Sequence, residues 1–125
     1  MHELLPASLE SVAEARRAVR RFAADLEVDL DGMVLAVSEA VANVVAHAYG
    51  EDAPGVLELS AAASPIEVTV TVRDHGAGLT GDSRSGAGYG LLIIKRLAQH
   101  VELADTRQGV ALTMAFRRGG AWSVN

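Results

Sequence analysis

Hydrophobic residues recur every three or four positions in two long stretches of the chain, which is the spacing of one buried helix face. The first predicted helix begins near Ser8 as its N-cap and runs to about Asp25. The second runs from about Asp29 to Tyr49, with Gly50 as its C-cap. The apolar positions are Val12, Ala15, Val19, Phe22 and Leu26 in the first helix, and Val34, Val37, Val41, Val44 and Ala48 in the second.

The second half of the chain is rich in short apolar and alternating runs, which are typical of strands. A short Ala-Ser-Pro connection between the first two runs predicts an antiparallel hairpin. The order of elements indicates an α+β two-layer sandwich, with a mixed, largely antiparallel sheet and helices on one face, formed by one domain over residues 1–125. The predicted elements are strands at 56–61 and 66–74, a Gly-rich loop at 76–90, a helix to about Gln99, and strands near 101–104 and 110–117.

Composition narrows the possible functions. The net charge of −5 disfavours binding to nucleic acid or to an anionic membrane. The chain contains no cysteine, which excludes disulfides, thiolate metal sites and cysteine nucleophiles. Polar residues interrupt the longest apolar stretch, Met33 to Tyr49, so it cannot span a membrane, and the N-terminus has no secretory signal. We therefore expect a cytoplasmic protein.

A basic cluster lies on the side of the first predicted helix opposite its apolar stripe. It consists of Arg16, Arg17, Arg20 and Arg21. Two interpretations stay open: a solvated helix face, or a docking surface for an acidic protein partner.

Three polar residues project from one side of the otherwise apolar second helix. Glu39, Asn43 and His47 are spaced four apart, so they share a face. Because burying an ionised carboxylate without a partner is costly, a polar site explains Glu39 better than packing does. An amide oxygen suits Mg²⁺, and a carboxylate can act as a general base on a hydroxyl. A purely structural role for the three residues remains the alternative, and for His47 a hydrogen-bonded structural role is the favoured one.

Asp74 ends a strand and is followed by His75, Gly76, Ala77 and Gly78. The two-residue period of the strand places Asp74 on the apolar, core-facing side. A carboxylate at this position, followed by glycines that allow close backbone approach, suits recognition of a purine amino group. The alternative is an Asp turn with no ligand.

The segment from Gly86 to Gly90, Gly-Ala-Gly-Tyr-Gly, opens an apolar helix. Free backbone N–H groups and the helix dipole hold phosphate in such an arrangement. By itself a GxGxG pattern is weakly specific, and it lacks the trailing Lys-Ser/Thr of a P-loop. Leu91 is expected in the core as well as at the border of the nucleotide. Arg84, in the preceding loop, could neutralise phosphate charge, or could be an ordinary loop arginine.

In order and spacing, these three segments resemble the N, G1 and G2 boxes of the Bergerat-fold (GHKL) ATPase and kinase superfamily over most of the chain. The run His47-Ala48-Tyr49 is especially similar to the anti-sigma-factor serine/threonine kinases of that superfamily. The resemblance implies a short ATP lid at residues 79–87. It also implies a catalytic base at Glu39, a magnesium ligand at Asn43 and adenine recognition by Asp74, with Gly76 and Gly78 bordering the base and Gly88 and Gly90 bordering the phosphates. The expected nucleotide-binding set further includes His47, Arg84, Gly86, Tyr89 and Leu91.

The resemblance further implies a function and partners. The cofactors would be ATP and Mg²⁺, and the acceptor a STAS-type anti-anti-sigma factor whose phosphorylation controls release of a sigma factor. A homodimer is expected. The alternative is a nucleotide-dependent protein-binding switch without phosphotransfer, which the presence of Glu39 disfavours. A two-component histidine kinase fits less well because the first helix contains no histidine.

Overall fold

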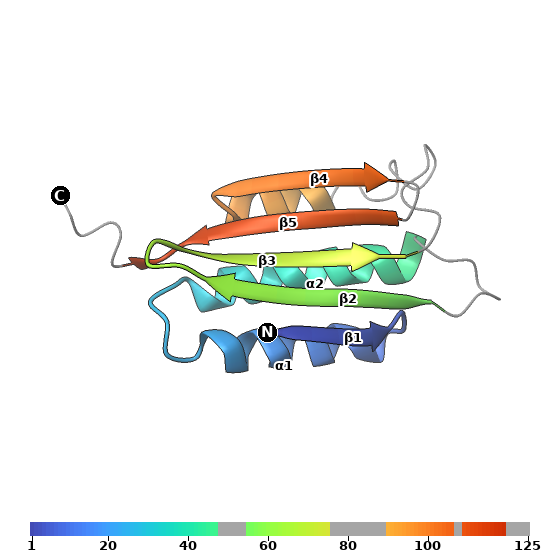
Figure 1. Cartoon of the computed structure of the whole chain (residues 1–125), viewed down its shortest axis with the longest axis horizontal. Coiled ribbons are helices and arrows are strands. Elements are labelled where there is room, and N and C mark those ends of the chain that lie inside the picture. Colours follow the sequence, from blue (N-terminus) through green and yellow to red (C-terminus); the bar gives the residue numbers. More distant parts are fainter. Residues whose placement is uncertain (48–54, 76–89, 107–108, 120–125) are drawn as a thin grey trace.

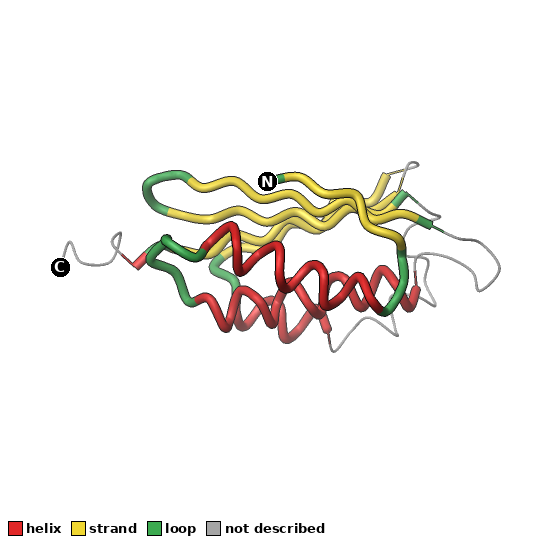
Figure 2. The backbone as a smooth tube through the Cα atoms, turned by 90° about the horizontal axis from the view of Figure 1, so that it is seen from below, coloured by secondary structure: helices red, strands yellow, loops and turns green. Residues whose placement is uncertain are grey.

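The computed structural model describes residues 1–47, 55–75, 90–106 and 109–119. In these ranges the chain forms two layers, a five-stranded sheet and helices on one of its faces (Figures 1 and 2). The expected α+β sandwich is therefore confirmed. In chain order the elements are β1 (His2–Pro6), α1 (Glu10–Ala23), α2 (Leu30–His47), β2 (Val56–Ala63), β3 (Glu67–Asp74), a helical segment at 90–97, β4 (His100–Thr106) and β5 (Gly109–Arg117).

The sheet has the strand order β1-β2-β3-β5-β4. All four pairings between these strands are antiparallel, so the described part contains none of the parallel pairings that a mixed sheet would have. The predicted hairpin is the β2–β3 pair, in which Leu57 lies opposite Asp74. In the β3–β5 pair, Glu67 lies opposite Arg117 and Arg73 opposite Ala111. The start of β3 and the end of β5 therefore lie at one end of the sheet, and Asp74 lies at the other.

The core lies between the sheet and the two long helices. Side chains alternate along β3, so Val68, Val70 and Val72 are buried while the residues between them are half-buried on the outer face. The predicted stripe of the first helix and that of the second from Val34 to Val44 face this core, as expected, whereas Ala48, Tyr49 and the predicted C-cap Gly50 lie outside the described residues. The most enclosed large side chains are Met33, Leu57, Leu59, Ile94, Met114, Val19, Val37, Val41, Val68, Val70 and Val72.

The start of the first helix differs from the prediction. Leu9 occupies the N-cap position and makes no side-chain capping hydrogen bond, so Ser8 is not the cap. Ser8 instead accepts a hydrogen bond from the Ser11 amide through its carbonyl oxygen, at 3.0 Å. A backbone hydrogen bond and the Ser8 hydroxyl lower the pKa of the Glu10 carboxyl. The Ser8 hydroxyl is therefore hydrogen-bonded to the side chain of Glu10, the first helical residue, and α1 has no side-chain N-cap.

β1 is an element that the sequence pattern does not predict. It pairs with β2, with Leu4 opposite Glu58. The strand is five residues long, and of its side chains only Leu5 is buried. Such a short edge strand ending in Pro6 carries too little alternation to be recognised from sequence.

Each of the four clustered arginines has a polar partner within the chain. Arg16 Nε donates to Ser38 Oγ at 2.7 Å and so links α1 to α2. Arg20 pairs with Asp31 at 3.7 Å. The other two pairs are Arg21 with Glu3, at 3.5 Å, and Arg17 with Glu14. These contacts account for the cluster structurally, and a docking role stays a prediction.

Candidate functional site

Asp74 is a buried carboxylate at the end of β3. It is 2% exposed, and its place on the core-facing side of the strand confirms the prediction from the two-residue period. The Val110 amide of β5 donates to Asp74 Oδ1 at 3.4 Å. Because a buried carboxylate requires polar partners, the hydrogen bond from the Val110 amide helps to stabilise Asp74 at this end of the sheet.

Gly109 allows β5 to approach Asp74 closely. Its φ is +123°, in the region that L side chains rarely adopt. A methyl group at this position would lie 2.1 Å from the Asp74 carbonyl oxygen and 2.8 Å from Oδ1. The sequence pattern places Val110 at the start of a strand but does not assign Gly109 or Val110 to the site. A glycine between two predicted strands signals a turn, but not that the turn lies against Asp74.

Asn43 and Gly90, which belong to two separate sequence motifs, are in contact. A methyl group added at Gly90 would lie 2.7 Å from Asn43 Nδ2 and 3.1 Å from Oδ1. The asparagine amide thus packs directly on the first residue of the helical segment 90–97. Two of the residues that the resemblance assigns to nucleotide binding, one on the second helix and one at the end of the Gly-rich loop, therefore lie side by side.

Glu39 is half-buried one turn before Asn43 on α2, which contacts β3. The residue before it is fixed from two sides. Ser38 Oγ donates to the Val34 carbonyl oxygen at 2.8 Å and accepts from Arg16 Nε at 2.7 Å. The backbone that carries Glu39 is therefore held by a buried hydroxyl and by a side chain from α1.

The remaining predicted site residues are placed as follows. His47 is the last residue of α2, and Leu91 packs against the core, as one of its two expected roles requires. The lid and six predicted nucleotide contacts lie outside the described residues: Gly76, Gly78, Arg84, Gly86, Gly88 and Tyr89.

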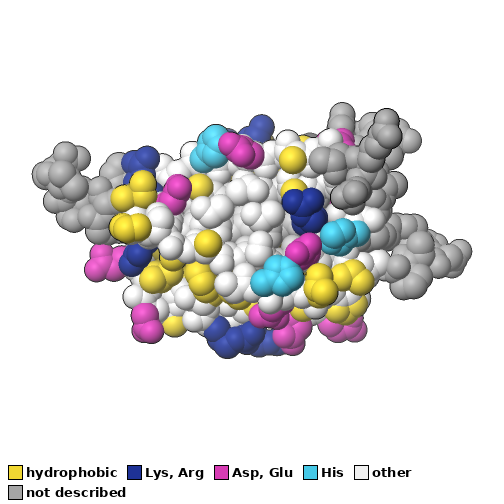
Figure 3. Space-filling model, in the orientation of Figure 1, with side chains coloured by type: hydrophobic (Ala, Val, Ile, Leu, Met, Phe, Trp, Pro, Cys, Tyr) yellow, Lys and Arg dark blue, Asp and Glu magenta, His cyan; other side chains and the backbone are white. Residues whose placement is uncertain are grey.

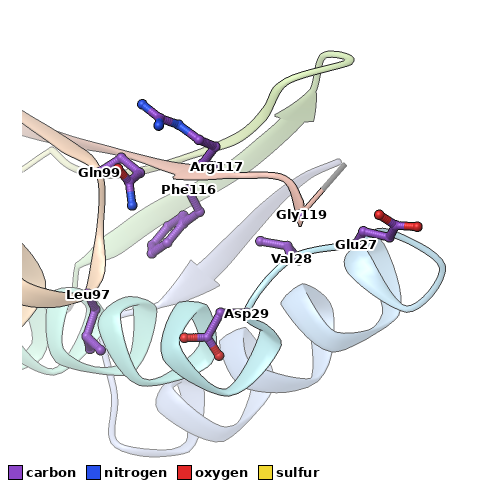
Figure 4. Close-up of a pocket in the computed structure, with 8 residues that line it drawn as sticks. All are labelled: Glu27, Val28, Asp29, Leu97, Gln99, Phe116, Arg117 and Gly119. Carbon is purple, nitrogen blue, oxygen red and sulfur yellow. The ribbon is translucent and has the colours of Figure 1, made fainter. Parts of the chain in front are cut away.

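A cavity of about 440 Å³ lies at the other end of the sheet (Figure 4). The Phe116 ring points into the space between the sheet and the helices, while Arg117 points away from it. Asp29 Oδ1 accepts a hydrogen bond from the Gly32 amide at 3.1 Å, so this carboxylate serves the start of α2. The charged groups do not converge on the hollow, whose lining is Glu27, Val28, Asp29, Leu97, Gln99, Phe116, Arg117 and Gly119.

The described residues contain no group of three or more His, Asp or Glu that could hold a metal ion. A Mg²⁺ ion held by one side chain together with phosphate and water oxygens does not require such a group. The amide of Asn43 against Gly90 and the buried Asp74 carboxylate fit an oxygen-bound ion and a purine amino group, respectively. In the part of the chain that the structure describes, no helix is long and apolar enough to cross a membrane.

The chain matches the histidine kinase-like ATPase domain family over residues 5–116. Among curated relatives, an anti-sigma F factor from Pasteuria penetrans is 32% identical over 84% of this chain and 81% of its own length. An anti-sigma F factor from Anoxybacillus flavithermus is 37% identical over 63% of this chain. The aligned part covers 56% of that relative's length.

Solved structures share the fold. One contains the RsbU and RsbW domains of Rv1364c from Mycobacterium tuberculosis. It matches with a TM-score of 0.70 and 23% identity over 94% of this chain and 32% of its own. The histidine kinase domain of a blue-light activated kinase from Erythrobacter litoralis matches with a TM-score of 0.64 and 18% identity over 90% of this chain and 61% of its own.

Proposed function

Because the chain belongs to the histidine kinase-like ATPase family, we propose that it is a Mg-ATP-dependent protein serine/threonine kinase that acts as an anti-sigma factor. The names of its curated relatives support the anti-sigma role. The presence of a carboxylate one turn before Asn43 supports transfer over binding alone, because a pure nucleotide switch needs no base.

The observation that carries the proposal is the packing at one end of the sheet. Asn43 of α2 contacts Gly90, and the carboxylate of Asp74 is buried beside Val110. In the proposed site, these three motifs, far apart in sequence, supply an amide for the metal ion, the N–H groups of a helix start for phosphate, and an acceptor for a purine amino group. Figure 1 shows that α2 and β3 end at the same end of the sheet.

The residues have distinct tasks in the proposed reaction. Asp74 accepts a hydrogen bond from the adenine amino group and thereby selects the base. Asn43 would hold Mg²⁺ through its amide oxygen, and Mg-ATP would supply the phosphoryl group when bound. Glu39 takes the proton from the acceptor hydroxyl, while positioning and charge stabilisation provide most of the rate.

The remaining residues of the predicted set border the nucleotide. We propose that His47 and Arg84 lie near its phosphates, and that Leu91 packs beside it. The glycines and the tyrosine of the set provide close backbone approach, at Gly76, Gly78, Gly86, Gly88, Tyr89 and Gly90.

The proposed partners are proteins. The acceptor is a STAS-type anti-anti-sigma factor, and it competes with a sigma factor for this chain, which we expect to be a homodimer. Phosphorylation adds about two negative charges at the docking surface. Because this chain already carries a net charge of −5, the added charges favour release of the phosphorylated partner.

The test is transfer of labelled γ-phosphate from Mg-ATP to a panel of STAS-domain proteins from the same organism. We expect one acceptor to be labelled on Ser or Thr. Glu39→Gln should reduce transfer at least about a hundredfold while ATP binding is retained. Asn43→Ala should lose Mg²⁺-dependent binding with the fold intact. ATP binding without any labelling would instead favour a binding switch, and full activity in Glu39→Gln would rule out the proposed base.

A further inference from the structure

Glu58 lies between two histidines on the outer face of the sheet. Its Oε1 lies 3.2 Å from His75 Nε2, and its Oε2 is hydrogen-bonded to His2 Nε2. The three residues come from β2, from the position directly after β3, and from β1. Figure 3 shows histidine and acidic side chains gathered on this face. One carboxylate thus joins three neighbouring segments.

His75 is the second residue of the Asp74-His-Gly-Ala-Gly segment. Asp74 points into the core, whereas His75 contacts a carboxylate on the opposite, exposed face of the sheet. The segment is therefore held from two sides at the position where it leaves β3. Val110 and Gly109 of β5 approach Asp74, and Glu58 of β2 holds the next residue.

We propose that Glu58 is a positioning residue for nucleotide recognition, acting through His75 on the orientation of Asp74. The inference rests on the proposed function, because it assigns Asp74 to the adenine base. A hydrogen bond that fixes His75 narrows the backbone conformations available to Asp74. The Asp74 carboxylate then meets the base in one orientation, and the entropic cost of ordering it on binding is lower. The role is indirect, since Glu58 lies on the outer face.

The experiment measures Mg-ATP and Mg-GTP affinity of the full chain by calorimetry. Glu58→Ala and His75→Ala should each weaken ATP binding about two- to fivefold, the range expected for one exposed hydrogen bond. GTP affinity should change less, so the ratio of ATP affinity to GTP affinity should fall. A loss of stability alone would lower both affinities equally. The double variant should be no weaker than either single variant, because both remove the same contact.

Two variants serve as controls. His2→Ala removes the other histidine partner of Glu58, but His2 lies on the edge strand β1, so ATP affinity should stay within about twofold of the wild type. Glu58→Gln keeps a hydrogen-bond acceptor for His75 and should restore most of the ATP affinity lost in Glu58→Ala. Wild-type affinity in Glu58→Ala, an equal loss in His2→Ala, or additive losses in the double variant would overturn the proposal.

Amide hydrogen exchange without nucleotide separates this inference from the proposed function. Glu58→Ala should accelerate exchange at Val110, whose amide donates to Asp74, and leave Phe116 at the far end of β5 unchanged. If the wild type fails to bind Mg-ATP, the proposed function is wrong. The exchange rate of the Val110 amide then still shows whether Glu58 restricts the orientation of Asp74. Unchanged exchange at Val110 would overturn the positioning role.

Discussion

The two ends of the sheet differ in how closely polar groups from different elements pack against one another. At the end near Asp74, glycines bring backbone and amide groups into direct contact with a buried carboxylate and with Asn43. At the other end there is a cavity of about 440 Å³, but Asp29 is engaged by its own helix and Arg117 points away. We therefore place the proposed nucleotide site at the end of the sheet where a buried carboxylate and the Asn43 amide lie against glycines from other elements, and not at the end with the larger empty volume.

The largest expected effect is at Gly109. Gly109→Ala would place a methyl group 2.1 Å from the Asp74 carbonyl oxygen at a φ of +123°. We expect a loss of roughly 2–4 kcal/mol in the free energy of unfolding, measured by urea titration. Gly119→Ala is the matched control at the hollow end, because its nearest contact is 3.4 Å from Glu27 Cβ. An equal loss in both variants would mean that the two ends are packed alike.

Gly90→Ala should affect nucleotide binding more than stability. The added methyl group would lie 2.7 Å from Asn43 Nδ2 and must displace the amide. We expect Mg-ATP affinity to fall about tenfold, or roughly 1.4 kcal/mol, by calorimetry. Gly32→Ala provides the contrast, because its methyl group would lie 2.4 Å from Asp29 Oδ2 and disturb only the start of α2. That variant should lose about 1 kcal/mol of stability and keep its ATP affinity. A loss of ATP affinity in Gly32→Ala but not in Gly90→Ala would contradict the placement of the nucleotide site at the end near Asn43.

The smallest expected effect concerns acid stability. The hydrogen bond from His2, followed by that from His75, lowers the pKa of the Glu58 carboxyl. A carboxyl whose folded-state pKa is depressed stabilises the fold above its unfolded value of about 4.5, and the contribution is lost as the pH falls through the folded pKa. Arg73 lies opposite Glu58 in the β2–β3 register.

The measurement is the Tm of Glu58→Gln and wild type between about pH 3 and pH 7. The wild type should be slightly more stable near neutrality, and the difference should vanish at the acid end. Glu102→Gln is the control, since Glu102 pairs with His100 at 2.9 Å within β4 and links no neighbouring strands. A pH-independent difference for Glu58→Gln would contradict the stated cause.

Residue spacing predicted much of this molecule, because both helices and the hairpin repeat a strong pattern over many positions. The same period placed Asp74 on the buried side of β3, and it grouped Glu39 with Asn43 on one helix face. β1 escaped because five residues ending in Pro6 carry little alternation.

The sequence did not predict the contacts of Asp74, for a different reason. The contact of Gly109 and Val110 with Asp74 depends on β5 pairing with β3, a long-range relation that no local spacing encodes. The packing of Asn43 on Gly90 is similar, because it joins two segments far apart in the sequence and neither spacing nor the resemblance of motifs predicted the contact. The contact between Glu58 and His75 depends on the register of β2 against β3, which the predicted hairpin did not specify.

The most direct test of the proposed nucleotide site is calorimetric titration of Mg-ATP into the wild type and into Asp74→Asn, which preserves the shape of the side chain and an acceptor for the Val110 amide but removes the charge. We predict binding by the wild type and at least about a tenfold loss of affinity in the variant, as expected for a charge-assisted hydrogen bond, with unfolding still cooperative. Equal affinity in the two proteins, or no binding by the wild type, would contradict the assignment of this end of the sheet as the nucleotide site.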